Sequence, residues 1–420
     1  MKFTRVFAFM ALAGLAGSAF ATNGYFSHGY GMKAKGMAGA GTANSEDAFG
    51  GANNPASMAF VGNRIDLGAD LFSPIREVSN DSAFGSRQTI ESDMDLFLVP
   101  EFGYNRMVNS NMSLGVTVYG NGGMNTDYQA VPGFGTTNIL GGGGSLGVDL
   151  MQLVIAPTLA YKVAPNHSLG VSPLIGYQRF AATGLSSFIG FSSNGAALTD
   201  QGHDDAFGFG VRVGYMGKIT PTVTIGAAYS SKIDFDEFSK YAGLFAEQGD
   251  FDLPENYNLG VAWQATPEVK LALDYQRINY ADVAAVGNPV TNLLVSGQLL
   301  GATNGPGFGY SNVDVWKLGI EYKYNPKLTL RAGYSQGDNP ISAADAGEVL
   351  FGILAPAVIE KHATLGFTYT LGSGDEVTMA YMHGFENDVT SARPGGAFGT
   401  SVDTIKMYQN SLGIQYSWKM

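Results

Sequence analysis

Histidines and carboxylates are the groups that could carry chemistry in this sequence, because it contains no cysteine. Without a thiol, a disulfide framework, a cysteine nucleophile and a thiolate metal site are all excluded. Besides the carboxylates, the groups available for acid–base chemistry near neutral pH are five histidines: His28, His167, His203, His362 and His383. A serine, a histidine and a polar third residue can hydrolyse lipids, but His383 lies close to Tyr381, which favours a place at a membrane interface. We assign no catalytic residue.

The acidic residues do not match a dedicated metal site. Asp234, Asp236 and Glu237 are close in sequence, yet they lack the glycine and the closing glutamate of a calcium loop. His203 precedes two aspartates in what reads as a solvated loop, where it could contact a cation only incidentally. We expect no metal and no other cofactor.

The N-terminus predicts export from the cytoplasm. Lys2 and Arg5 precede a short apolar stretch, and Ala19-Phe20-Ala21 is typical of a signal-peptidase site. We therefore expect residues 1–21 to be removed as a signal peptide. Their loss leaves 24 − 2 = 22 basic residues against 36 acidic ones, so nucleic acid is not an expected partner.

The composition indicates that something other than water covers much of the surface. Charged residues make up 14% of the chain, against about 25% in ordinary globular proteins. Aromatic residues reach 12%, and there are 58 glycines. Beyond the signal peptide no apolar stretch is long enough for a membrane helix, so a membrane protein of this sequence must be a β-barrel.

Alternation of side-chain type supports transmembrane strands. Near the C-terminus, apolar and aromatic residues alternate with small or polar ones: Leu412, Ile414, Tyr416 and Trp418 against Ser411, Gly413, Gln415 and Ser417. One face of such a strand suits lipid and the other suits a polar lumen. Many of these runs exceed the five or six residues usual in soluble sheets and suit a tilted membrane strand of about nine to eleven residues.

The runs and turns together predict an all-β fold, a transmembrane antiparallel barrel of about fourteen strands. The strands are expected near residues 64–73, 92–106, 111–121, 147–163, 167–181, 204–219, 222–236, 255–266, 268–280, 311–325, 327–336, 359–371, 375–386 and 404–418. Short turns alternate with long loops, which places the long loops outside the cell. Three of these loops are apolar, around residues 185–191, 238–245 and 293–300, and predict a landing site for hydrophobic ligands or loops that pack on one another.

Residues 22–62 do not alternate and cannot form a wall strand. A barrel of about fourteen strands encloses a lumen that needs contents. We therefore expect residues 22–62 to form a hatch that plugs the lumen, and residues 63–420 to form the barrel.

Four segments of this hatch carry a recognisable pattern: Gly29-Tyr30-Gly31, Gly36-Met37-Ala38-Gly39-Ala40, Asp47-Ala48 and Asn53-Asn54-Pro55-Ala56. Further segments follow in the barrel: Asp252-Leu253-Pro254, Leu330-Arg331-Ala332-Gly333-Tyr334 and Tyr381-Met382-His383-Gly384. In this order they resemble the long-chain fatty-acid transporter family of outer-membrane channels (FadL/TodX type). The resemblance implies a fourteen-stranded barrel, an N-terminal hatch, and an inward kink of the third strand that opens the wall.

The resemblance also suggests residues for ligand binding and gating. In the hatch these are Phe26, Asn54, Pro55 and Ala56, and at the kink they are Gly120, Asn121, Gly122 and Gly123, a stretch that an ordinary extracellular turn would also explain. Lys317 is expected inside the lumen by its parity. Arg179 matches a head-group residue of the family by position, although its parity points to lipid unless the strand bulges.

These features together predict an outer-membrane channel for passive uptake of long-chain fatty acids or related hydrocarbons, with capture by the loops and lateral release. The alternatives are a non-specific porin or structural barrel, and an outer-membrane lipid hydrolase. Expected partners are the hydrophobic ligands, outer-membrane lipid including lipopolysaccharide, and the barrel assembly machinery. We expect a monomer.

Overall fold

The computed structural model describes residues 23–81, 83–342, 347–393, 395 and 399–420; the expected signal peptide lies outside them. Sixteen strands form one antiparallel sheet, which closes on itself where β16 pairs with β1. All strands except the short β2 and β9 build the wall, so the barrel has fourteen wall strands. This confirms the predicted all-β barrel with an even number of strands.

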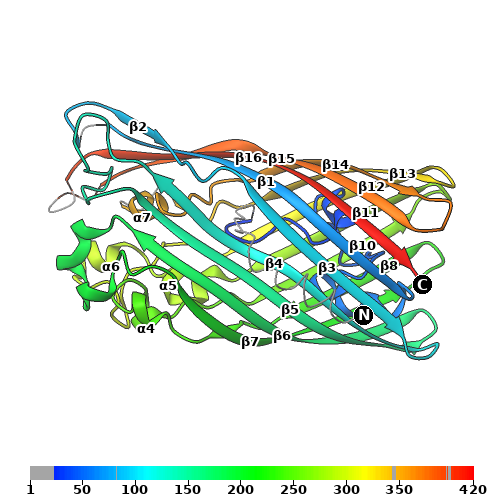
Figure 1. Cartoon of the computed structure of the whole chain (residues 1–420). Coiled ribbons are helices and arrows are strands. Elements are labelled where there is room, and N and C mark those ends of the chain that lie inside the picture. Colours follow the sequence, from blue (N-terminus) through cyan, green and yellow to red (C-terminus); the bar gives the residue numbers. More distant parts are fainter. Residues whose placement is uncertain (1–22, 82, 343–346, 394, 396–398) are drawn as a thin grey trace.

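The strands tilt across the long axis of the barrel, and the small helices gather at one end and in the lumen (Figure 1). The wall strands are β1 (Arg64–Asn80), β3 (Phe97–Met107), β4 (Met112–Tyr128), β5 (Leu146–Ala164), β6 (His167–Thr183), β7 (Asp204–Lys218), β8 (Val223–Ser230), β10 (Asn256–Gln264), β11 (Val269–Ile278), β12 (Val313–Asn325), β13 (Leu328–Gly337), β14 (Lys361–Thr370), β15 (Glu376–Ala392) and β16 (Val402–Lys419). The short strands are β2 (Gln88–Glu91) and β9 (Asp234–Phe235).

The helices in the described residues are all short. The hatch contains α2 (Met32–Lys35), α3 (Gly50–Asn53) and η1 (Pro55–Ala59), and the loops contain η2 (Ser186–Phe191), η3 (Gly195–Ala197), η4 (Ser239–Tyr241), α4 (Ala246–Gly249), η5 (Tyr280–Asp282), α5 (Ala284–Gly287), α6 (Thr291–Leu294) and α7 (Glu348–Gly352). Among the described residues, no helix has the length and apolar character needed to cross a membrane.

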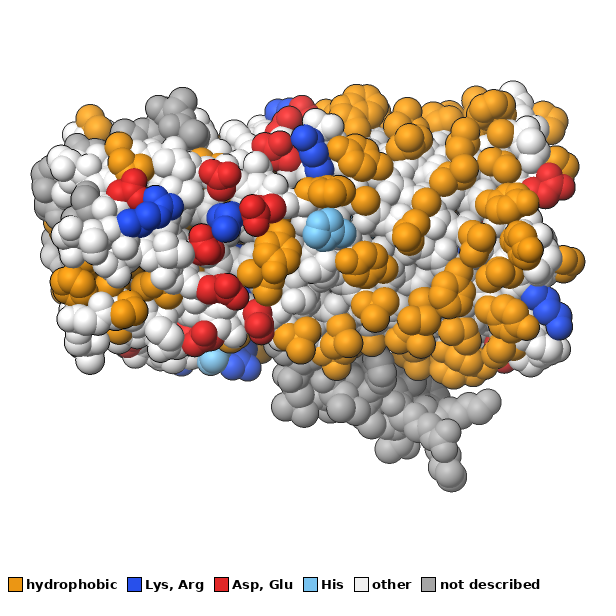
Figure 2. Space-filling view, turned by 90° about the horizontal axis from the view of Figure 1, so that it is seen from above, with side chains coloured by type: hydrophobic (Ala, Val, Ile, Leu, Met, Phe, Trp, Pro, Cys, Tyr) orange, Lys and Arg blue, Asp and Glu red, His pale blue; other side chains and the backbone are white. Residues whose placement is uncertain are grey.

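The alternating sequence explains the two surfaces of the wall. In β12 the side chains of Trp316, Leu318 and Ile320 are exposed, whereas the alternate residues Lys317 and Glu321 are buried in the lumen. Repeated around the barrel, this pattern makes the outer band of hydrophobic side chains in Figure 2, which charged side chains border toward the loop end. Lipid covers such a band, and the lumen keeps the polar groups.

The hatch residues described, 23–62, lie inside the barrel, where nearly all of them are buried (Figure 1, dark blue). Ion pairs fasten them to the wall: Lys35 Nζ lies 2.8 Å from a carboxylate oxygen of Asp70 and 2.8 Å from one of Glu101. Lys33 pairs with Glu376 at 2.8 Å. These contacts hold α2 in place.

The hatch also spans the seam where the barrel closes. Lys35 bonds Asp70 on β1, while the Met32 amide donates to Gln415 Oε1 on β16 at 2.8 Å. The two wall strands meet in register here, with Asp70 opposite Gly413. The hatch therefore bonds to both strands of the seam.

Candidate functional site

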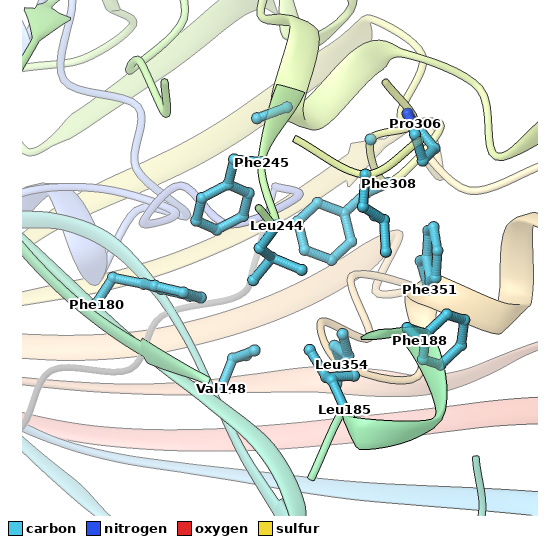
Figure 3. A pocket seen from close by; sticks show the side chains of 13 residues that line it. Val148, Phe180, Leu185, Phe188, Leu244, Phe245, Pro306, Phe308, Phe351 and Leu354 are labelled. Atoms are coloured by element: carbon cyan, nitrogen blue, oxygen red, sulfur yellow. The ribbon is translucent and has the colours of Figure 1, made fainter. Parts of the chain in front are cut away.

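An apolar pocket lies among the extracellular loops (Figure 3). It encloses about 460 Å³, including its mouth, and is lined by Val148, Phe180, Leu185, Phe188, Leu244, Phe245, Ala285, Leu300, Pro306, Gly307, Phe308, Phe351 and Leu354. Strands β5 and β6 supply one side and four separate loops supply the rest. None of these lining residues is ionisable, so the pocket suits hydrophobic solutes.

Aromatic contacts shape this pocket. The ring centroids of Phe180 and Phe245 are 4.7 Å apart, and those of Phe188 and Phe351 are 5.6 Å apart. Tyr241 packs edge-on against Phe180 from behind, at 4.8 Å. Aromatic pairs of this kind hold loops rigidly at modest entropic cost.

The apolar residues of the loops thus fall into two groups, those that line the pocket and those that are exposed to solvent. Leu185, Phe188, Leu244, Phe245 and Leu300 line the pocket. Ile189 and Val295 are instead exposed, at 48% and 78%. Loop packing and a ligand-sized pocket therefore coexist in the same loops.

A series of aromatic contacts leads from the pocket to the hatch. Phe245 lies 4.8 Å from Phe251, and Phe251 lies 6.1 Å from Tyr25, both measured between ring centroids. Tyr25 in turn packs on Tyr280 at 5.0 Å. The hydroxyl of Tyr280 accepts hydrogen bonds from the amides of Tyr25 and Phe26, which fixes the first residues of the hatch.

Strand β4 carries a bulge where the sequence places its glycine-rich stretch. The pairing of β4 with β5 shifts register between Gly120 and Gly122, so that Asn121 is left out of the ladder. Asn121 bonds the hatch instead: its carbonyl accepts from the Ser27 amide at 3.0 Å, and its side chain accepts from Tyr30 Oη at 3.0 Å. A bulge of this kind bends the strand.

Gly122 allows the hatch to touch the bulge directly. Phe26 and Gly122 form an antiparallel bridge. A Cβ atom at position 122 would stand 2.0 Å from the carbonyl oxygen of Tyr25, which no side chain could tolerate without movement of the hatch. Of the kink residues expected from the sequence, Gly120 and Gly123 flank this contact within β4.

Beyond the bulge, β4 loses its partner on one side. Strand β3 pairs with β4 only from Phe102 opposite Val118 to Met107 opposite Ser113. Among the wall strands, residues 119–126 of β4 have only β5 as a partner, and contact between the two sides resumes at the bridge between Ser92 and Tyr128. We call the stretch between residues 94–101 and 119–126 the wall gap. In this stretch β3 and β4 are not paired with each other.

The Asn-Pro-Ala segment lies elsewhere, where η1 docks on β6 and β7. Asn54 Nδ2 donates to the carbonyls of Thr42 and Tyr215, at 2.8 and 2.9 Å. Ser168 Oγ donates to the carbonyl of Ala56 at 2.8 Å. Asn54 also caps η1, with Pro55 in the first turn. The structure places these residues as hatch anchors, away from the apolar pocket.

The two expected cations differ in position. Arg179 lies on the outer face of β6, as its parity indicates, and its guanidinium contacts His203 Nδ1 at 2.9 Å. Lys317 is buried in the lumen and donates to the carbonyl of His28 at 3.1 Å. Lys317 also lines a second, polar cavity of about 340 Å³ between the hatch and the wall, together with Tyr30 and Arg212.

Burial controls the charge of the hatch side chains. Burial, reinforced by the charge of Lys35, lowers the pKa of His28 well below its usual range, so the ring is neutral. Burial alone would also lower the pKa of Lys35, but the carboxylates of Asp70 and Glu101 raise it above its ordinary value. Lys35 thus stays charged inside the lumen.

Sequence reasoning did not identify several residues that build the pocket. Phe180 is an inward residue of β6, and the alternation could have identified it. Phe308 and Phe351 come from loop segments without periodicity, so no local signal marks them. Their convergence depends on the tertiary arrangement of the loops.

Comparison with known proteins places this arrangement in a family. A sequence profile described as outer membrane protein transport protein (OMPP1/FadL/TodX) matches residues 10–412. The chain has no significant match among curated protein sequences.

Solved structures share the fold at low sequence identity. The Pseudomonas putida toluene transporter TodX has a TM-score of 0.68 and 20% identity, over 94% of this chain and 99% of that one. A Pseudomonas aeruginosa FadL homologue has a TM-score of 0.71 and 16% identity over the same shares. The Ralstonia pickettii toluene transporter TbuX has a TM-score of 0.65 and 17% identity, again over 94% and 99%. Since the family profile spans nearly the whole sequence, the chain belongs to the OMPP1/FadL/TodX family of outer membrane transport proteins.

Proposed function

We propose that this protein is a channel for passive uptake of hydrophobic small molecules across the outer membrane. The observation that carries the proposal is the extracellular pocket, whose lining residues are all apolar or glycine and include five phenylalanines. The names of similar structures support this ligand class, because two of them are toluene transporters and one is a FadL homologue.

The route that we propose begins at the pocket and ends at the wall gap. Hydrophobic ligands would collect among the loops, follow the aromatic series from Phe245 to Tyr25, and leave sideways beside β4. Phe26, Asn121 and Gly122 are the gating residues in this proposal, because they join the hatch to the kinked strand. Gly120 and Gly123 would permit the bend, and Asn54, Pro55 and Ala56 would anchor the rest of the hatch.

The energetics of such a channel require only a concentration gradient. Each methylene group transferred from water to hydrocarbon gains about 0.8 kcal/mol. A hydrophobic ligand therefore already prefers the membrane interior, and its obstacle is the polar saccharide layer outside. A lateral exit delivers it to the bilayer without release into water.

Two rival functions are less well supported. An open porin needs a water-filled lumen, whereas the hatch fills much of this one. A lipid hydrolase needs an activated serine that lipid can reach; His383 contacts Asn410 at 2.9 Å, and Ser335, which contacts His362 at 3.2 Å, is buried together with that histidine. We propose no catalytic residue and no metal or cofactor. Among the described residues, no group of three histidines or carboxylates is placed to hold a metal.

We also propose that outer-membrane lipid, including lipopolysaccharide, surrounds the wall and that the chain acts as a monomer. The barrel assembly machinery would recognise the last strand, where Ser411, Gly413, Tyr416 and Trp418 follow the pattern of a terminal insertion signal.

Transport assays on the full chain in liposomes test the channel. We expect slow swelling in sugar solutions together with rapid uptake of labelled oleate or toluene. Replacing Ala285, which lines the pocket, by tryptophan should lower uptake about tenfold, because the indole would occupy the space of the ligand and a loss of about 1.4 kcal/mol in binding is tenfold. Rapid sugar flux in the unaltered protein would contradict the proposal and favour a porin.

Ala281→Trp is the matched control. Ala281 is exposed and lies only four residues from Ala285, so the same change there should leave uptake unaltered. Equal losses in both variants would show that the pocket is not on the route.

A further inference from the structure

Arg76 is a buried cation on the lumen side of β1. It is 3% exposed and lies between two other inward residues, Phe72 and Val78. The next residue, Glu77, points to the outer face, where its carboxylate pairs with Lys406 at 3.3 Å. This ion pair lies closer to the loop end than Leu71, an exposed residue of the lipid band. Arg76 therefore lies inside the wall at about the level where the apolar band gives way to charged residues.

Arg76 differs from the ion-paired cations of the lumen and, like the buried Lys317 and Arg212, has no carboxylate partner among the described residues. Lys35, Arg64 and Arg331 each form an ion pair of 2.7 to 2.8 Å with a buried carboxylate. Arg76 forms no ion pair with any described residue: one nitrogen donates to the carbonyl of Met94, and Nε has no hydrogen-bond partner. Its Cζ lies 5.9 Å from the ring centroid of Phe97.

The surroundings of Arg76 supply a second unused polar group. Tyr128 is fully buried and its hydroxyl has no partner; it forms a bridge with Ser92, whose amide bonds the carbonyl of Arg76. Asp95 acts electrostatically on Arg76, but Asp95 is exposed and beyond ion-pair distance. A buried guanidinium without an anion destabilises the folded protein, because its desolvation energy is not compensated. Such unpaired charges are found mainly at binding sites.

Arg76 and Tyr128 lie at the end of the wall gap that is nearer the loops. The Ser92 amide donates to the carbonyl of Arg76 at 2.9 Å, and Ser92 bridges Tyr128 across the gap. Directly below, a separate hydrophobic cluster is formed by Phe72, Phe97, Val99 and Met382, with Met94 packed against it. A cation without an ion pair and a hydroxyl without a partner thus lie beside a buried apolar cluster.

We propose that Arg76 and Tyr128 bind the carboxylate of an amphipathic ligand, whose hydrocarbon chain lies on the Phe72 cluster. The inference rests on the proposed uptake of hydrophobic molecules and adds a head-group site at the exit. The carboxylate would supply the anion that Arg76 lacks and accept the Tyr128 hydroxyl. Because Arg76 lies at the edge of the lipid band, the chain can enter the bilayer while the carboxylate stays at the interface.

Binding of two ligands that differ only in the head group tests this site. For the purified full chain we expect tighter binding of dodecanoate than of dodecan-1-ol. Arg76→Met should weaken dodecanoate binding roughly tenfold or more, since hydrogen bonds to charged groups are the stronger ones. The same variant should leave dodecanol binding within about twofold. Tyr128→Phe should weaken dodecanoate binding less, and Arg76→Lys should restore part of it.

Arg106→Met is the matched control, because Arg106 is an exposed cation on neighbouring β3, away from the gap. It should bind both ligands like the unaltered protein. The unfolding temperature of Arg76→Met should stay the same or rise, because removing an unpaired buried charge relieves its cost.

The outcomes separate the two proposals. If the unaltered protein binds neither ligand and liposomes take up neither, the proposed function fails. If it binds and transports both but Arg76→Met leaves the preference for dodecanoate unchanged, only the Arg76 site is overturned. Equal weakening of both ligands, with a lower unfolding temperature, would likewise overturn the site and leave Arg76 a structural role.

Discussion

At the scale of single residues, Asp47 makes the seating of the hatch sensitive to pH. Burial, and then the negative charge of Asp66, raise the pKa of Asp47 from 3.8 to about 6. The folded protein therefore binds a proton here more tightly than the unfolded chain does. The sign follows from linkage: stability from this group is present below about pH 4 and is lost as pH rises to about 6.

We therefore expect Asp47→Asn to stabilise the hatch at pH 7 and to change it little at pH 4. The difference is at most about 3 kcal/mol, the free energy that corresponds to this pKa change. This difference in stability can be measured as a change in the amide protection factors of residues 31–59, by hydrogen–deuterium exchange at both pH values. An asparagine variant that is less protected than the unaltered protein at pH 7 would contradict the prediction.

Residue positions show what alternation can and cannot predict. Parity correctly placed Lys317 in the lumen, and it placed Arg179 on the outer face despite the family position. Parity cannot predict partners, so it did not show that Lys317 bonds the hatch through the His28 carbonyl. Alternation does not predict Arg76 as an inward residue, because the expected first strand ends at residue 73, before Pro74, whereas β1 continues to Asn80.

At the scale of elements, the bulge of β4 is where hatch and wall meet. Gly122→Ala should push the first hatch residues away, because the new Cβ would lie 2.0 Å from the Tyr25 carbonyl oxygen. We expect faster amide exchange in residues 23–28 and altered uptake of hydrophobic ligand, with sugar flux still slow because the ion pairs of α2 remain.

Gly143→Ala serves as the control for this prediction. Gly143 lies in an extracellular loop, and a Cβ added there meets nothing within 4 Å. If Gly122→Ala behaved like Gly143→Ala in both exchange and uptake, the contact between Phe26 and Gly122 would have no gating role.

The number of wall strands was predictable, but their ends were not. Each wall strand alternates while it crosses the lipid band, since lipid and lumen demand opposite side chains. Above the band both faces meet polar surroundings or loops, so alternation no longer marks the strand. β4 therefore continues to Tyr128 and β15 to Ala392, beyond the expected residues 121 and 386, and the expected strand 222–236 is divided into β8 and β9.

At the scale of the whole molecule, buried ion pairs keep the hatch in the lumen. Lys35 forms ion pairs with both Asp70 and Glu101, which are buried. Lys35→Met should leave two carboxylates without a counter-ion and destabilise the protein by about 3–5 kcal/mol. Chemical unfolding measures the loss, and liposome swelling should reveal faster sugar flux as the hatch loosens.

Lys218→Met is the comparison for this variant, because Lys218 is exposed at the end of β7. That change should alter neither stability nor sugar flux appreciably. If Lys35→Met kept its stability and its slow sugar flux, the ion pairs would not be what retains the hatch.

The contacts of α2 across the seam bear on the order in which the protein assembles. The hatch is made first and the last wall strand is made last, yet Lys35 bonds β1 and Met32 bonds β16. A barrel that shut its seam around an empty lumen would enclose Asp70 and Glu101 with no cation beside them. The seated hatch adds bonds to both ends of the sheet, so we expect it to favour closure of the seam in this register.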